Sequence, residues 1–199
     1  MGNRGNLYFV IYKPYKVLSQ FTDEDVNKGL GSVFELPKNV YPVGRLDLDS
    51  EGLLILTNDR KLNHRLLDPK YQHKRTYWVE VEGTPTSDAL EAFSDGVEIN
   101  LKGRRYMTKK AKAKFVSEVT GIEERIPPVN YTKHPIRSWL EIELIEGKNR
   151  QVRKMTAAVG HPTLRLIRVG IEDLSLFPMK PGELTQISEK VLKKKLKLG

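Results

Sequence analysis

The chain has 199 residues, 39% of them hydrophobic, which is enough to bury one sizeable core without requiring a second domain. Lysine and arginine outnumber aspartate and glutamate by 34 to 25, which gives a formal net charge of +9 and a pI near 9.6. This surplus favours a polyanionic partner, although a merely soluble basic protein has the same composition. Cysteine is absent, which excludes disulfides, thiolate metal sites and a cysteine nucleophile.

Membrane insertion and metal binding are not indicated either. No segment approaches the roughly 18 consecutive apolar residues of a membrane span, and the start of the chain lacks a signal-type apolar stretch. The four histidines lie far apart without the spacing of metal ligands. We therefore expect a cytoplasmic protein without a metal, built as one compact domain over residues 1–199 that can be bilobed.

Two buried strands and a capped helix are predicted in the first part of the chain. Residues 7–12 form a nearly unbroken apolar and aromatic run that ends before Pro14, which cannot donate to a strand ladder. Residues 53–57 form a second apolar run of strand length. Asp59 can cap a helix that follows this run and ends before Pro69.

The next segment predicts a strand and a helix. Residues 76–83 alternate between apolar and polar side chains, as a half-buried strand does, and Tyr77 lies on the apolar face. Thr86 opens a helical pattern that stops at Gly96, whose freedom to adopt positive φ suits a helix end.

A cationic strand is predicted at residues 110–115. Lys110, Lys112 and Lys114 alternate there with apolar side chains. Such a row can bind phosphates, but a solvated edge strand protected from aggregation by lysines has the same pattern. Both interpretations stay open at this point.

The last part of the chain predicts two strands, a helix and a basic tail. Proline and charge in residues 121–137 predict a long loop, which resembles a mobile, substrate-facing element. Strands are predicted at 138–146 and 164–169, with a helix at 149–159 that packs by one face and presents basic side chains on the other. The tail, 190–198, favours a solvated terminal helix over an RNA contact.

The most informative segment is residues 44–59, where three acids and an arginine precede a buried strand in an otherwise basic chain. Carboxylates weaken a surface that only binds RNA, so their presence indicates chemistry on a bound polyanion. Two alternatives stay open. Asp47 and Asp49 have a spacing that can share Mg²⁺ in a nucleotide enzyme. Asp47 can also be a turn residue in a non-catalytic RNA-binding or ribosome-assembly protein.

Taken together and in order, the motifs resemble the RsuA family of pseudouridine synthases. The motifs that carry the resemblance are Gly-Arg-Leu-Asp at 44–47, Gly-Leu-Leu at 52–54, Lys-Arg-Thr-Tyr at 74–77, Asn-Arg-Gln-Val-Arg-Lys-Met at 149–155, Gly-His-Pro at 160–162 and Leu-Ile-Arg at 166–168. Together with Lys13-Pro14 near the start, they span nearly the whole chain. Lys16 and Arg60 stand where the family often has glycine, and both lie outside the acid and arginine motifs.

The resemblance implies an α/β (α+β) fold, the pseudouridine synthase fold, with a mixed, mostly antiparallel central sheet, flanking helices and a central catalytic cleft. The short turns between alternating strands support antiparallel pairing independently. Family members commonly carry a small N-terminal RNA-binding module, which we expect this chain to lack.

The reaction that the resemblance implies is the isomerisation of uridine to pseudouridine in large-subunit (23S) ribosomal RNA. It involves no redox change, so no cofactor is expected. Asp47 matches the catalytic aspartate, which acts as nucleophile or base. Arg153 matches the arginine that pairs with this aspartate and would keep it ionised. Tyr77 matches the tyrosine that stacks on the uracil.

RNA is the expected partner, and contacts to it are predicted for a set of basic side chains. These are Lys13, Arg45, Lys110, Lys112, Arg150, Lys154 and Arg168. Neither a membrane nor a metal is an expected partner, and we expect a monomer.

Overall fold

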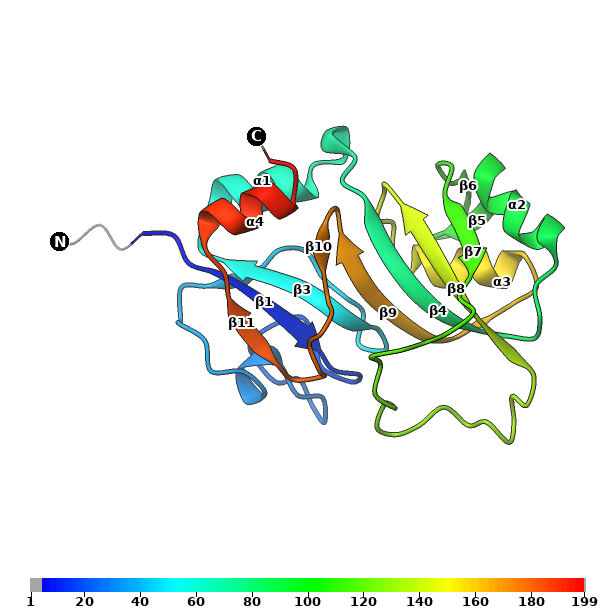
Figure 1. Cartoon of the computed structure of the whole chain (residues 1–199), viewed down its shortest axis with the longest axis horizontal. Helices are drawn as coiled ribbons and strands as arrows, with labels where there is room; N and C mark the ends of the chain where they lie inside the picture. Colours follow the sequence, from blue (N-terminus) through cyan, green and yellow to red (C-terminus); the bar gives the residue numbers. More distant parts are fainter. Residues whose placement is uncertain (1–4, 199) are drawn as a thin grey trace. The chain divides into compact units, whose positions relative to one another are not determined.

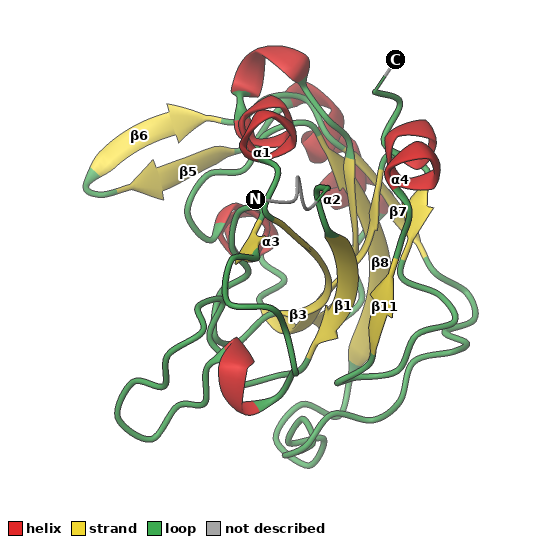
Figure 2. Cartoon of the chain, turned by 90° about the vertical axis from the view of Figure 1, so that its left-hand side faces the viewer, coloured by secondary structure: helices red, strands yellow, loops and turns green. Residues whose placement is uncertain are grey.

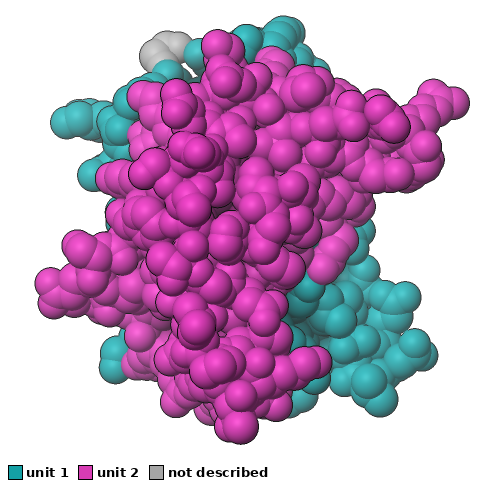
Figure 3. Space-filling view, turned by 90° about the vertical axis from the view of Figure 1, so that its right-hand side faces the viewer, with its two compact units in different colours: residues 1–73, 170–199 teal, residues 74–169 magenta. Residues whose placement is uncertain are grey.

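The computed structural model of the chain describes residues 5–198, which form two compact units (Figure 3). The first unit comprises residues 1–73 and 170–199, and the second comprises residues 74–169. No helix in the described part of the chain is long and apolar enough to cross a membrane.

The first unit is built on antiparallel strands in the order β11-β1-β3 (Figure 1). In addition, β2 pairs with β3, and β10 pairs with the end of β9. Their bounds are β1 Tyr8–Lys13, β2 Tyr41–Pro42, β3 Glu51–Thr57, β10 Leu174–Ser175 and β11 Leu184–Gln186. Every residue of β1 and β3 is buried, which confirms the two predicted apolar strands. Their side chains form a core with Leu46, Leu30 and Phe34.

Two α-helices belong to the first unit, α1 (Arg60–Leu67) and α4 (Glu189–Lys195), with short 3₁₀ turns at Leu30–Ser32 and Pro69–Tyr71. The Asp59 carboxylate accepts hydrogen bonds from the backbone N–H groups of Lys61 and Leu62, so the predicted cap is confirmed. Asp59 also accepts a buried hydrogen bond of 2.9 Å from the Tyr8 hydroxyl. In α4 the lysines are exposed while Leu192 is buried, so the predicted terminal helix packs by one side.

The second unit has the strand order β9-β4-β8-β7 and two helices. The bounds are β4 Arg75–Glu82, α2 Ser87–Asp95, β7 Lys112–Phe115, β8 Arg137–Leu144, α3 Gln151–Ala158 and β9 Thr163–Ile171, whose last two residues belong to the first unit. The β4–β8 and β7–β8 pairs are antiparallel, as predicted. One face of β4 and β8, with Tyr77 and Ile142, forms a core with Phe93 of α2 and Met155 of α3.

A hairpin that the sequence did not predict, β5 (Glu98–Leu101) and β6 (Arg104–Met107), forms a separate two-stranded sheet. Figure 2 shows it standing apart from β7 and β8. Lys102 and Gly103 both have positive φ at its tip, the geometry of a tight hairpin turn. The Asn100 side chain accepts a hydrogen bond from the Gly103 N–H and closes this turn.

The predicted loop is confirmed, since residues 121–136 contain no helix or strand. Arg137, at the start of β8, forms an ion pair of 3.0 Å with the buried Glu80 of β4. Its guanidinium carbon also lies 3.9 Å from the ring centroid of Tyr131. These contacts fasten the C-terminal part of the loop to β4.

Candidate active site

Asp47 lies half-buried in the loop between β2 and β3 of the first unit. The Leu46 side chain directly before it is buried in the core with Leu54. The Ser50 N–H donates to the Asp47 carbonyl over 3.0 Å and closes a turn, and the Lys16 N–H donates to the Leu48 carbonyl over 2.9 Å. The Asp47 backbone is therefore held on both sides.

Ser19 adds a constraint that the sequence analysis missed. Its buried hydroxyl donates to the Leu46 carbonyl over 2.7 Å and accepts from the Leu46 N–H over 2.9 Å. One side chain thus satisfies both polar backbone groups of the residue before Asp47. A single serine 27 residues away from its partner carries no local signal in a sequence.

Gly44 opens the Gly-Arg-Leu-Asp motif with φ of +73°. A Cβ atom there would lie 2.9 Å from Cδ2 of Leu67, closer than unstrained side-chain packing allows. The backbone conformation therefore favours glycine at this turn, while the exposed Leu67 side chain could shift to make room for a Cβ. Arg45, which follows it, is exposed as an RNA contact would be.

Lys13 takes a different position from the exposed one expected of an RNA contact. It is fully buried, and its ammonium group donates to the carbonyls of Pro14 over 2.9 Å and Val17 over 2.6 Å. These bonds close the turn after β1. They favour a structural role for Lys13 over contact with an RNA phosphate.

Tyr77 lies on β4 in the second unit, opposite Ile142 of β8. It is 8% exposed and belongs to a core cluster that includes Val152 and Met155 of α3. The ring is therefore fixed by packing against the helix that carries Arg153. Its stacking on uracil stays a prediction.

Helix α3 is anchored at its start by a buried polar cluster around Glu146. The Glu146 carboxylate accepts from the Tyr106 hydroxyl over 2.8 Å, the Lys109 N–H over 2.7 Å and the Gln151 amide over 2.6 Å. Gln151 in turn accepts from the Lys148 N–H over 2.9 Å. The hydrogen bond to Glu146 raises the pKa of the Tyr106 hydroxyl above its ordinary value. This cluster sets where α3 begins, two residues before Arg153.

Arg153 is half-buried on α3 and donates to the Thr163 carbonyl over 3.4 Å. The helix begins at Gln151, two residues later than predicted, so Arg150 precedes it in a left-handed conformation with φ of 51°. Arg150 is exposed and Lys154 is half-buried. Arg168 on β9 is only 5% exposed, which gives an RNA backbone little access to it.

The three predicted catalytic residues do not share one unit. Asp47 belongs to the first unit, and Tyr77 and Arg153 belong to the second. Their assembly in a central cleft stays a prediction. Among residues 5–198, no group of three or more His, Cys, Asp or Glu side chains is arranged to hold a metal ion.

Residues 7–158 match the family described as RNA pseudouridylate synthase. The match covers more than half of the chain, which therefore belongs to this family and is a pseudouridine synthase, an isomerase that acts on RNA. This confirms the family and the fold that the motifs predicted.

Within this family, the chain is similar to individual pseudouridine synthases over most of its length. The chain is 47% identical over 173 residues to the ribosomal large subunit pseudouridine synthase E of Xanthomonas axonopodis pv. citri, with 86% of this chain and 89% of that protein covered. It is 46% identical to the protein of the same name from Vibrio parahaemolyticus, with 89% and 72% covered. A solved pseudouridylate synthase structure superposes with a TM-score of 0.77 at 25% identity, over 96% of this chain and 74% of that one.

Proposed function

We propose that the chain isomerises one specific uridine of large-subunit (23S) ribosomal RNA to pseudouridine, and that it acts as a monomer in the bacterial cytoplasm. The observation that carries this proposal is the 47% identity, over 86% of the chain, to a ribosomal large subunit pseudouridine synthase E. The rigidly held Asp47 loop supports the chemistry, because a reacting carboxylate needs a fixed position.

Asp47 is the proposed nucleophile. It attacks the glycosidic carbon of the uridine, and the uracil leaves with the electron pair of its N1–C1′ bond. The uracil then turns, C5 bonds to C1′ and displaces the Asp47 carboxylate. Finally C5 loses its proton and N1 gains one. The balance of atoms is that of an isomerisation, so the step needs no external oxidant or reductant.

Tyr77 and Arg153 complete the proposed centre. A uridine must leave its helix or loop to react, which costs a few kcal/mol. Stacking on the Tyr77 ring, worth about 1–3 kcal/mol per base, offsets this cost. The proposed role of the Arg153 guanidinium is to pair with the Asp47 carboxylate and orient it for attack. Arg45 and Arg150 are both exposed, which supports their proposed contact with the RNA backbone.

The proposal is tested by tritium release from large-subunit ribosomal RNA whose uridines carry tritium at C5. Small-subunit ribosomal RNA serves as the control, and a parallel reaction contains a chelator. We expect release from the large-subunit RNA only, unaffected by the chelator. Loss of release with the chelator would favour the magnesium enzyme. Tight binding without release, on naked RNA and on partly assembled particles, would favour the non-catalytic RNA-binding protein.

A further inference from the structure

A pocket of about 420 Å³ lies within the second unit, where β4 begins, β8 ends and β7 begins. Three lysines and one glutamate line it, namely Lys74, Lys110, Lys112 and Glu143. A volume of this size is in the range of pockets that hold small ligands. None of the three proposed catalytic residues lines it.

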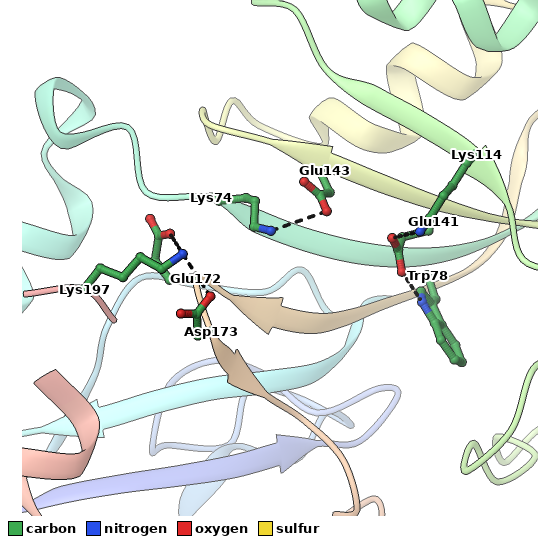
Figure 4. A network of polar contacts seen from close by, with 8 residues as sticks. All are labelled: Lys74, Trp78, Lys114, Glu141, Glu143, Glu172, Asp173 and Lys197. Atoms are coloured by element: carbon green, nitrogen blue, oxygen red, sulfur yellow. Dashed lines mark hydrogen bonds and ion pairs between the residues drawn. The ribbon is translucent and has the colours of Figure 1, made fainter. Parts of the chain in front are cut away.

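The charges at the pocket leave a positive excess. Lys74 pairs with Glu143, with 3.4 Å between Nζ and Oε1 (Figure 4). Lys112 lies opposite Glu143 in the β7–β8 register. Lys110 and Lys112 are both exposed, and neither has an ion pair or hydrogen bond from its side chain within residues 5–198. Two ammonium groups are therefore available to an anion.

Apart from Ser94 of α2, the rest of the lining is apolar. Ala111 is 5% exposed and Leu144 is 3% exposed, and both belong to the core of the second unit. Ile145 beside them is partly exposed. A rigid apolar wall next to two cations and a carboxylate suits a ligand with three matching parts: a flat base, a phosphate and an N–H donor.

We propose that this pocket binds a nucleotide of the RNA substrate other than the reacting uridine. The base packs on Ala111 and Leu144, the phosphate lies between the Lys110 and Lys112 ammonium groups, and Glu143 accepts an N–H of the base. The inference rests on the proposed function, since it assigns a second contact to the same RNA. It also resolves the two interpretations of the lysine row in favour of phosphate binding at Lys110 and Lys112.

Lys114 lies on β7 with Lys112 and has different partners. Its ammonium group lies 2.9 Å from Glu141, and the Trp78 indole donates to the same carboxylate over 3.1 Å (Figure 4). Lys114 does not line the pocket. It therefore behaves as a lysine that protects an edge strand, and Lys114→Ala is a matched control.

Two variants separate the parts of the proposal. Lys110→Ala combined with Lys112→Ala removes the phosphate ligands and leaves the apolar wall intact. Ser94→Trp fills the pocket from an exposed position of α2 without changing the charge.

Binding of a mixed-sequence single-stranded RNA hexanucleotide is measured by fluorescence anisotropy at several salt concentrations. Amide NMR spectra of the wild type with this RNA, with uridine monophosphate and with inorganic phosphate locate the contacts.

We expect the hexanucleotide and uridine monophosphate to shift the signals of Ala111, Lys112 and Leu144. Both variants raise the Kd for the hexanucleotide by about tenfold, while Lys114→Ala leaves it unchanged. The lysine variant also flattens the log–log salt slope by about 0.7, the value for one phosphate contact of a single strand. Ser94→Trp leaves that slope unchanged. A wild-type Kd for Ser94→Trp, shifts confined to other residues, or equal binding of inorganic phosphate and uridine monophosphate would overturn the proposal.

The tritium assay keeps this test separate from the test of the reaction. With active wild-type enzyme, the two pocket variants raise KM and leave kcat unchanged. If the wild type released no tritium but the hexanucleotide still bound at this pocket, the proposed reaction would be wrong and the pocket proposal would stand.

Discussion

Lys16 occupies a backbone conformation that suits glycine. Its φ is +57°, and its N–H holds the carbonyl of Leu48 in the Asp47 loop. Left-handed backbone costs an L-residue roughly 1–2 kcal/mol, so the glycine that the family often has here is explained by conformation. Lysine in place of glycine at position 16 strains the turn, but the hydrogen bond from its backbone N–H to the Leu48 carbonyl is kept.

We predict that Lys16→Gly is more stable than Lys16→Ala by about 1 kcal/mol, because only alanine keeps the strain. Chemical denaturation of both variants measures the difference. Equal stabilities would show that the turn adapts, and that the left-handed conformation carries no cost here.

Removing the Ser19 hydroxyl leaves the buried N–H and carbonyl of Leu46 without their partner. We predict that Ser19→Ala lowers the free energy of unfolding by about 1–3 kcal/mol. It also lowers kcat more than it changes KM, because the Asp47 carboxylate loses its fixed position. Ser32→Ala, which removes an exposed hydroxyl bonded to Asp23, is the control. An equal kcat loss in both variants would count against the positioning role.

Glu80 contributes a pH dependence to stability. Burial raises the pKa of its carboxyl, and Arg137 and Arg165 offset only part of this shift. A raised pKa in the folded state means that folding favours the protonated form. Its contribution to stability is therefore present below the unfolded pKa and is lost as pH rises through the folded pKa.

Glu80→Gln cannot titrate, so it isolates this effect. We predict that the stability of the wild type relative to Glu80→Gln falls as pH rises from about 4, near the ordinary glutamate pKa, to neutrality. Urea unfolding of both proteins across this range gives the difference. A relative stability that rises with pH would mean that the arginines outweigh the burial.

At the scale of elements, the position of α3 depends on Glu146. We predict that Glu146→Ala destabilises the chain by about 2–3 kcal/mol, the value of a hydrogen bond to a buried charge. It also returns the pKa of the Tyr106 hydroxyl toward its ordinary value and lowers kcat, because α3 carries Arg153. Ultraviolet titration of tyrosine and the tritium assay measure the two effects. An unchanged Tyr106 titration would contradict the hydrogen bond on which this account rests.

Elements with strong local patterns could be predicted from the sequence. The cap at Asp59, the helix end at Gly96 and the alternation in β4 are set by neighbouring residues, so they are visible locally. The β5–β6 hairpin was missed because its strands have four residues each and are mostly exposed. β11 was missed because it has three residues and is stabilised by pairing with a distant strand, β1.

The candidate site was predictable only in part, because contacts between residues distant in the chain leave no local pattern in the sequence. Asp47, Tyr77 and Arg153 came from motifs, because their residue types and order are specific to a family. Ser19 and Glu146 act through hydrogen bonds to residues far away in the chain, which leave no periodicity or motif. The burial of Lys13 could not be predicted, because a lysine that ends an apolar strand is more often exposed.

At the scale of the whole molecule, the proposed catalytic set draws on both units. Asp47 comes from the first unit, while Tyr77 and Arg153 come from the second. The formal net charge of +9 suits attraction of a polyanion to either unit. The chemistry, in contrast, is assigned to one carboxylate.

The most direct test of this assignment is the single-turnover rate of tritium release from large-subunit ribosomal RNA for Asp47→Asn beside Asp49→Asn. Asp49 lies two residues away in the same acidic loop and is also half-buried, so its variant is a matched control. We predict no release above background for Asp47→Asn, with RNA binding retained, and a rate close to wild type for Asp49→Asn. Release by Asp47→Asn at the wild-type rate would contradict the central claim.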